Sequence, residues 1–355
     1  MKKLSIIIVF VAFSLIGCSS GSSSGGGSSP TPLPTTSSST QTGYVLNQGN
    51  NTVSVCFELG CFAQPVIDGT TYQDALNLLA GTGIGVNENY VFIGGDNDGV
   101  SRLDSKLITC DRNSFGLLGS CTESATKTFA GAPLRIASVK LSNTNLYFAS
   151  STTESGTAPV IVNCQIVNSG VDYSSCVDTA LPLGEGVNGI YIESNILYGV
   201  SEKSNLVIRI GIGPDGNLLP STFESQSVLA NIQPLGVPGE IRAITITNGY
   251  AYISYPGAPN NDTILICPVN ADGSLNVPLC TTNYNLVFNG PVGMFSLESK
   301  VFVLNYGLGG NHPIGTTVTS CSATESGLNS SSCISSNGNG TFSVPIAMDI
   351  FTQYN

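Results

Sequence analysis

A phrase of about fifty residues recurs along the chain from Tyr44 onward, and this repeat constrains the fold more than any other feature. Each copy has a tract with Gly or Pro, an apolar strand, a short polar turn and a second strand rich in aromatic and β-branched residues. Equivalent positions in the second strands are 46, 56, 51, 54 and 50 residues apart, at Val45, Val91, Tyr147, Tyr198, Tyr252 and Phe302. A period of this length indicates a repeat architecture.

Two further strands follow in each copy, joined by hairpin turns such as Pro214-Asp215-Gly216 and Ala271-Asp272-Gly273. Asp-Gly between two strands is a strong hairpin signal. Six copies of four strands predict an all-β fold, a six-bladed β-propeller of four-stranded antiparallel blades. Residues 344–351 repeat the first strand of a copy, so we expect this C-terminal strand to complete the first blade and close the ring.

The N-terminal residues have the pattern of an export signal followed by a tether. Lys2 and Lys3 precede the apolar run 5–16, which is shorter than the ~20 residues that span a bilayer. Residues 19–43 are almost all Ser, Gly, Thr and Pro, a composition that cannot bury apolar surface and predicts a disordered tether. The expected organisation is therefore a signal peptide at 1–17, a tether at 18–43 and the propeller at 44–355.

Leu15-Ile16-Gly17-Cys18 resembles the lipobox of bacterial lipoproteins, in which the cysteine becomes the first mature residue and carries the lipid. The alternative is an ordinary signal peptide that contains a cysteine. Ser19 follows the cysteine, and the resemblance then implies the outer membrane, because an aspartate at this position keeps enterobacterial lipoproteins at the inner membrane. We expect membrane attachment through lipidated Cys18, with a palmitate-type acyl chain and a body that faces the periplasm or the cell surface.

Ten of the eleven cysteines remain once Cys18 is assigned to the lipid. They fall into five sequence-local pairs, which export to an oxidising compartment would convert to disulfides: Cys56/Cys61, Cys110/Cys121, Cys164/Cys176, Cys267/Cys280 and Cys321/Cys333. The pairs are expected to join the third and fourth strands of a blade. The fourth copy has Gly211 where its neighbours have a cysteine. Metal binding is the weaker alternative for the cysteines, because the chain has one histidine and no Cys-x-x-Cys.

The charge balance excludes one class of partner. The formal net charge is −11, and removal of a leader containing Lys2 and Lys3 takes it to −13. Only 12 residues are Lys or Arg, too few to suggest phosphate contacts along a nucleic acid, so no nucleic-acid partner is expected.

Tyr44-Val45-Leu46-Asn47, with residues 51–55, resembles the YVTN-type repeat of bacterial surface and lactonase-like propellers, with Leu46 in place of the usual threonine. Weaker echoes recur in every copy. The resemblance implies the propeller architecture and leaves the activity open, because this superfold hosts unrelated functions.

Polar residues in the predicted loops and near the inner strands are the candidates for a binding face: Asp96, Asp98, Arg135, Asn188, Glu240, Arg242, Asn305, His312 and Asp349. Asp96-Asn97-Asp98-Gly99 begins like a calcium loop but lacks the downstream glutamate, which favours a polar turn. His312 lies in a Gly-rich loop, where a solvated side chain is the simpler interpretation than a general base.

Three functions remain open, and one of them is a purely structural surface protein, which only data on partners would distinguish from a binding module. The predicted anchor and tether, and the lack of a recognisable catalytic cluster, favour a binding or scaffold module for an envelope protein, peptide or glycan, with no cofactor, no metal and no catalytic residue. The alternative comes from the resemblance to six-bladed lactonase-type hydrolases, which hold a divalent cation, calcium for example, at the channel mouth. In that case Glu240, Asn188, Asn305 and Asp349 would converge as its ligands.

Overall fold

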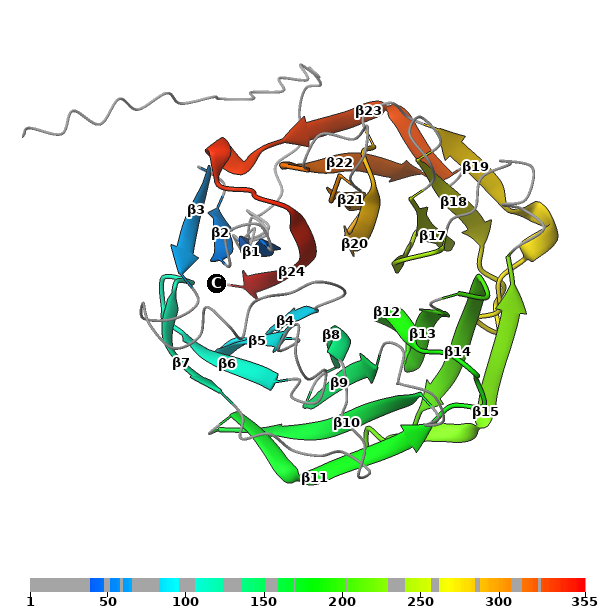
Figure 1. The fold of residues 1–355 in the computed structure, drawn as a ribbon, viewed down its shortest axis with the longest axis horizontal. Helices are drawn as coiled ribbons and strands as arrows, with labels where there is room; N and C mark the ends of the chain where they lie inside the picture. The colour runs from blue at the N-terminus through cyan, green and yellow to red at the C-terminus, as the bar shows by residue number, and fades with distance from the viewer. Residues whose placement is uncertain are drawn as a thin grey trace, which may run out of the picture. The chain divides into compact units, whose positions relative to one another are not determined.

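The structure is a computed structural model, and it describes residues 39–47, 52–57, 60–65, 83–95, 106–123, 136–142, 144–150, 159–168, 170–201, 203–228, 240–256, 262–284, 288–307, 315–324 and 327–354. These residues lie in one compact unit, Ser39–Asn355. Figure 1 shows six sheets in sequence order around one axis, and each sheet has four antiparallel strands. The predicted six-bladed β-propeller is confirmed.

The first three blades each run from an inner strand next to the axis to an outer edge strand. Blade 1 has β24 (Pro345–Tyr354), β1 (Ser39–Asn47), β2 (Thr52–Phe57) and β3 (Gly60–Pro65). Blade 2 has β4 (Ile84–Val86), β5 (Tyr90–Gly95), β6 (Lys106–Arg112) and β7 (Leu118–Glu123). Blade 3 has β8 (Ile136–Ser142), β9 (Asn145–Ser150), β10 (Val160–Val167) and β11 (Gly170–Ala180).

The other three blades repeat this order. Blade 4 has β12 (Val187–Glu193), β13 (Ile196–Ser201), β14 (Leu206–Ile212) and β15 (Leu218–Ser227). Blade 5 has β16 (Ile244–Thr247), β17 (Tyr250–Tyr255), β18 (Thr263–Pro268) and β19 (Thr281–Tyr284), with the 3-10 turn η2 (Val277–Leu279) before its last strand. Blade 6 has β20 (Pro291–Leu297), β21 (Lys300–Asn305), β22 (Thr317–Thr324) and β23 (Gly327–Ser336), followed by η3 (Gly338–Gly340).

The C-terminal strand closes the ring as expected. β24 is the inner strand of blade 1 and pairs along the whole of β1, from Ser39 opposite Tyr354 to Asn47 opposite Pro345. Because β24 is long enough to pair with them, residues 39–43, expected to be tether, belong to a strand that begins five residues before Tyr44. Within the described part of the chain, no helix has the length and apolar character needed to cross a membrane.

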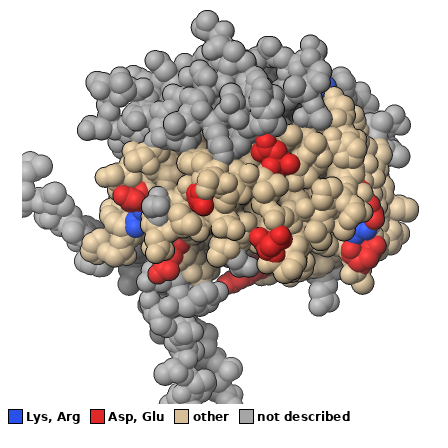
Figure 2. Space-filling model, turned by 90° about the horizontal axis from the view of Figure 1, so that it is seen from below, with Lys and Arg blue, Asp and Glu red and all other residues tan. Residues whose placement is uncertain are grey.

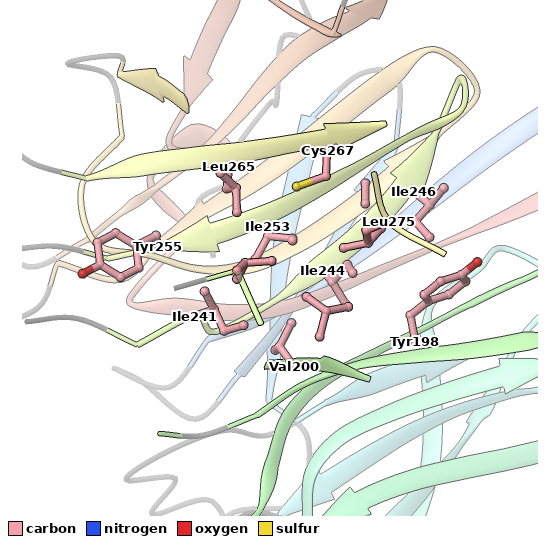
Figure 3. Packing of buried hydrophobic residues seen from close by; sticks show 13 residues of the cluster. Tyr198, Val200, Ile241, Ile244, Ile246, Ile253, Tyr255, Leu265, Cys267 and Leu275 are labelled. Atoms are coloured by element: carbon pink, nitrogen blue, oxygen red, sulfur yellow. The ribbon is translucent and has the colours of Figure 1, made fainter. Parts of the chain in front are cut away.

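The blades are held together by apolar side chains between adjacent sheets. Figure 3 shows one such cluster, in which Tyr198 and Val200 of blade 4 lie against Ile244, Ile246 and Ile253 of blade 5. Their exposed fractions are 5% or less. The second strand of a blade is buried on both faces. Tyr44 and Val45, which are adjacent in β1 and point to opposite faces, are both 0% exposed.

Strand pairing corrects the predicted alignment of the repeats by one residue in two blades. In every blade an aromatic residue of the second strand faces the residue just before the third-strand cysteine position; these aromatics are Tyr44, Phe92, Tyr147, Tyr198, Tyr252 and Phe302. The equivalent positions in blades 1 and 2 are thus Tyr44 and Phe92, where Val45 and Val91 were expected. A strand that is buried on both faces lacks the alternation of apolar and polar residues that would fix its register. The predicted alignment of the repeats was therefore wrong by one residue in these two blades.

These aromatics also link neighbouring blades through hydrogen bonds. The hydroxyls of Tyr44, Tyr147 and Tyr198 donate to the carbonyl oxygens of Gly116, Gly216 and Gly273, at 2.6, 2.6 and 2.9 Å. Each acceptor is the positive-φ glycine of the outer hairpin in the next blade. We name these contacts the tyrosine latches.

Loss of one latch should be measurable. We expect Tyr198→Phe to lower the free energy of unfolding by about 1 kcal/mol, because a buried carbonyl loses its donor. Tyr252→Phe is the matched control, since among the described residues its buried hydroxyl has no hydrogen-bond partner. Urea denaturation of both variants tests this, and equal losses would show that the Gly273 hydrogen bond contributes nothing.

The five predicted disulfides are confirmed. Cys56–Cys61, Cys110–Cys121, Cys164–Cys176, Cys267–Cys280 and Cys321–Cys333 all join the two outer strands of a blade or the segments next to them. Blade 4 has no such bond among its described residues, and its cysteine-equivalent residue is Ile210, where Gly211 was expected. Ile210 faces Leu197 as Cys164 faces Leu146.

The partner position in blade 4 is Phe223. In blade 3 the Ser175 hydroxyl, just before Cys176, donates to the Asp172 carbonyl and accepts from the Gln165 amide. The Thr222 hydroxyl, just before Phe223, makes the same two bonds, to the Leu219 carbonyl and from the Gly211 amide. Ile210 and Phe223 therefore occupy the cysteine positions as an apolar pair within one cluster.

This equivalence predicts that a sixth disulfide can be introduced. The double variant Ile210→Cys/Phe223→Cys should form a bond closing a loop of the same size as in the other blades, where sequence separations reach 13. Relative to Ile210→Ser/Phe223→Ser, which keeps the other five disulfides, the oxidised variant should gain about 2 to 3 kcal/mol, the value for loops of this length. Thermal unfolding of the two oxidised variants measures the gain; free thiols remaining after oxidation would contradict the register.

Candidate functional site

The six inner strands, β24, β4, β8, β12, β16 and β20, contact one another in order around the axis. At one level, each of them places a residue opposite the aromatic position that recurs in the second strand of every blade. We call this set the central layer; it consists of Asp349, Gly85, Lys140, Tyr191, Thr245 and Phe295. The six residues of the central layer therefore occupy the same pairing position in each blade.

Asp349 and Lys140 form the charged half of the central layer. The Lys140 ammonium lies 4.0 Å from Asp349 Oδ1 and 5.0 Å from the centroid of the Phe295 ring. Asp349 Oδ2 accepts from the Val86 amide at 2.9 Å, and Oδ1 accepts from the Ile350 amide at 3.0 Å. The two charged side chains keep 13% and 14% of their surface exposed, so solvent still reaches the pair.

Tyr191 organises the polar half of the layer. Its hydroxyl donates to the Ile246 carbonyl at 2.9 Å and lies 3.1 Å from Ser296 Oγ. Thr245 donates to the same Ser296 oxygen at 2.7 Å, so the contacts join blades 4, 5 and 6. Burial raises the pKa of Tyr191 to about 12, which keeps its hydroxyl protonated and able to donate.

The Asp349 carboxyl group has a perturbed acidity. Burial raises its pKa above the ordinary value, and this effect exceeds the opposing effects of the Lys140 ammonium and the Val86 and Ile350 amides. A carboxyl group with a raised pKa, beside a cation and with some solvent access, has the properties expected of a general base.

Three of the sequence candidates lie together at the end of the ring where inner strands begin, which we call the mouth. Arg242 contacts Glu240 through a 2.8 Å ion pair, and the two side chains are 33% and 35% exposed. Asn188, at the irregular start of β12, is 3.5 Å from the Ile241 carbonyl. The mouth therefore presents a partly exposed ion pair with an amide beside it.

Asn305 does not join the mouth. It is 0% exposed at the end of β21, where its amide donates to Thr317 and Thr319 at 2.9 Å and its oxygen accepts from the Asn289 amide. Asn47 makes the same kind of contacts in blade 1, with Thr52, Ser54 and the Ser343 amide. Asn305 is thus a structural residue of the repeat, and the expectation that it is a ligand is corrected.

The other candidates lie outside the described residues. These are Cys18, Asp96, Asp98, Arg135 and His312.

The predicted calcium set does not fit the described residues. Asp349 lies in the central layer, where its carboxylate contacts Lys140 and two backbone amides. Glu240 forms an ion pair with Arg242. Asn305 uses its amide for hydrogen bonds within its own blade. The part of the chain that the structure describes contains no group of three or more His, Cys, Asp or Glu side chains placed to hold a metal ion. A protonated amine takes the position beside Asp349, where the calcium hypothesis requires a cation.

The sequence analysis did not predict Lys140, Tyr191 and Ser296 as site residues. A usable signal existed, because polar residues in the first strand of a repeat stand out against its apolar pattern. Lys140 in β8 and Tyr191 in β12 occupy the same repeat position as Asp349. Correct alignment of the repeats would have brought the three together.

Charge on the described surface is sparse. In the side view of Figure 2, acidic groups form separate small patches on a surface of mostly uncharged residues, and some of the few basic groups lie beside acidic ones. The described residues of this face carry no extended basic field.

Comparison with known proteins identifies the class of fold. No protein-family model and no curated protein matches the chain. Among solved structures, a periplasmic gluconolactonase from Pseudomonas aeruginosa is similar over 88% of this chain and 99% of its own, with a TM-score of 0.55 and 11% identity. A 6-phosphogluconolactonase candidate from Bacteroides fragilis is similar over 90% and 100%, with a TM-score of 0.51 and 13% identity.

A third similar chain comes from a nidogen–laminin complex, over 88% of this chain and 98% of that one, with a TM-score of 0.55 and 8% identity. At these identities the likeness shows the fold alone. The protein is thus a six-bladed β-propeller whose structural neighbours include lactonase-like propellers.

Proposed function

We propose that the propeller hydrolyses a lactone or a similar ester at the central layer. The observation that carries this proposal is the Asp349–Lys140 pair, a carboxyl group of raised pKa beside an ammonium on the axis of the ring. The likeness to lactonase-like propellers supports a hydrolase more than the scaffold role that the sequence favours.

The chemistry needs a base for the attacking water and a cation for the carbonyl oxygen. Asp349 accepts a proton from water as the water oxygen bonds to the lactone carbonyl carbon, and the Lys140 ammonium stabilises the resulting oxyanion. When the ring C–O bond breaks, the Asp349 carboxyl group returns the proton to the leaving alkoxide. The product is a hydroxy acid, and the enzyme regains its starting state.

The neighbours of the pair fix its geometry. Val86 and Ile350 hold both oxygens of Asp349 through their amides, and Phe295 lies under the Lys140 ammonium. The Tyr191 hydroxyl lies in the same layer and donates its one proton to the Ile246 carbonyl, so its oxygen is available to accept a hydrogen bond from a substrate hydroxyl. The calcium set does not fit the described residues, so no step is assigned to a divalent cation.

A direct assay tests the function. The purified, disulfide-bonded propeller is supplied with neutral γ- and δ-lactones and aryl esters, and acid release is followed at constant pH, with the uncatalysed rate subtracted. We expect saturable hydrolysis of at least one lactone. No rate above background across the panel, with a correctly folded protein, would reject the hydrolase.

Binding of an envelope protein, peptide or glycan is the second candidate. The partly exposed Glu240–Arg242 pair at the mouth supports it, because rim charges of this kind fix the orientation of a partner. Crosslinking in intact envelopes, compared between the native chain and Arg242→Ala, tests it. An unchanged set of crosslinks would exclude the mouth as the contact.

We also propose that the protein is exported, cleaved before Cys18 and anchored by acyl chains to the bacterial outer membrane, with the residues between Cys18 and β1 as tether. The lipobox-like sequence and the serine at position 19 support this proposal. Labelling with a palmitate analogue should mark the native chain and leave Cys18→Ser unlabelled. Protease treatment of intact cells then distinguishes a periplasmic from a surface-facing body.

A further inference from the structure

The inner strands have no surplus positive charge, and this bears on which lactone the ring accepts. Among the described residues from Glu240 to the end of β16 and in the other inner strands, two are basic, Lys140 and Arg242, and three are acidic, Glu193, Glu240 and Asp349. Their sum is +2 − 3 = −1. The inner strands and the described part of the mouth therefore carry a slightly negative formal charge.

Both cations are already paired with carboxylates. Arg242 lies 2.8 Å from Glu240, and Lys140 lies 4.0 Å from Asp349. A phosphate dianion binds well where Arg and Lys side chains point at it without a competing carboxylate. Here a phosphate would have to displace Glu240 from Arg242 and would then face that carboxylate at close range, where like charges repel.

The net charge of the protein adds to the repulsion of a phosphate group. The formal net charge of −11 gives a negative potential that slows the approach of anions and leaves neutral molecules unaffected. A phosphorylated lactone is therefore expected to approach the mouth more slowly than the same lactone without its phosphate group.

We propose that the substrate is a neutral lactone without a phosphate group, and that Glu240 excludes the phosphorylated form of such a lactone by neutralising Arg242. This inference rests on the proposed hydrolase function. It names Glu240 as a specificity-determining residue that takes no part in the reaction, because its ion pair lies at the mouth and the reacting pair lies in the central layer.

The experiment compares kcat/KM for glucono-δ-lactone and its 6-phosphate, each corrected for uncatalysed hydrolysis. We expect the native protein to favour the neutral lactone by about tenfold or more, and added salt to narrow the gap by screening. Glu240→Gln keeps the shape of the side chain and frees Arg242, so it should raise kcat/KM for the phosphorylated lactone several-fold and leave that for the neutral lactone nearly unchanged.

Glu224→Gln is the matched control. Glu224 also holds an arginine, Arg209, through a 2.8 Å contact, but on the outer strands of blade 4. We expect this variant to leave the preference unchanged. Faster hydrolysis of the phosphorylated lactone by the native protein, or an unchanged preference in Glu240→Gln, would overturn the inference and leave the hydrolase standing. No hydrolysis of either lactone would overturn the inference, and the panel of lactones and aryl esters would then decide separately whether the protein is a hydrolase.

Discussion

Asp349→Asn should lower kcat/KM for a lactone by ~100- to 10,000-fold, the usual contribution of a general base. The amide preserves the shape of the side chain and can still accept from the Val86 amide, but it cannot take a proton from water. Steady-state kinetics at constant pH measure the loss, and circular dichroism checks the fold. Glu193→Gln is the control, because Glu193 is a carboxylate on another inner strand, β12, where it accepts from the Tyr191 hydroxyl at 3.4 Å and does not belong to the Asp349–Lys140 pair. Equal activity in native and Asp349→Asn protein would reject Asp349 as the base.

The pH dependence follows from the same carboxyl group. Asp349 must be ionised to act as a base, so the rate should fall as pH is lowered through its raised pKa, at a higher pH than an ordinary aspartate would give. The effect on stability has the opposite direction. A folded state with the raised pKa binds the proton more tightly than the unfolded state, so this group's contribution to stability decreases as pH rises from the ordinary value through the raised one. Asp349→Asn should remove both dependences.

Removal of the C-terminal strand should have the largest effect on stability. A chain that ends at Val344 loses β24, whose Ile346 and Met348 are each 8% exposed and pack against neighbouring blades. Burial of two such side chains contributes about 3 to 6 kcal/mol, a large part of the 5 to 15 kcal/mol that typically stabilises a domain. The deletion also leaves β1 as an open edge facing the axis. We expect an insoluble chain or one without a cooperative thermal transition.

A chain that lacks only Asn355 is the matched control and should melt like the native protein, because β24 ends at Tyr354. A synthetic peptide of residues 345–354, added in trans, should partly restore the transition of the longer deletion. An unchanged melting temperature in the long deletion would show that ring closure does not stabilise the propeller.

The number of blades, the strand order and the disulfides could be predicted from the sequence because each depends on local signals. Asp-Gly turns, cysteines 5 to 13 residues apart and a fifty-residue period are visible without knowledge of the packing. The site could not be predicted in the same way. Lys140 and Asp349 are far apart in sequence, and their meeting depends on a register that sheets buried on both faces do not encode.

The errors have the same origin. Asn305 has the polarity of a ligand, but only the paired strand shows that Thr317 and Thr319 use its amide. Gly211 was predicted to occupy the cysteine position of blade 4. Only the pairing of Leu197 with Ile210 between β13 and β14 shows that this position is one residue earlier, at Ile210. Asp349 was predicted as a candidate, but it was grouped with Glu240 and Asn305, whereas the structure places it beside Lys140. The height of a residue along the axis depends on how the blades assemble, which the sequence alone does not show.

The pairing of Ser39 with Tyr354 puts the start of β1 and the end of β24 side by side, at the end of the ring opposite the mouth. A purification handle, a solid support or a fused reporter joined directly before Ser39 or after Tyr354 would therefore attach at the end of the ring away from Glu240 and Arg242. The propeller is accordingly suited to oriented display on a sensor surface without redesign of its entrance.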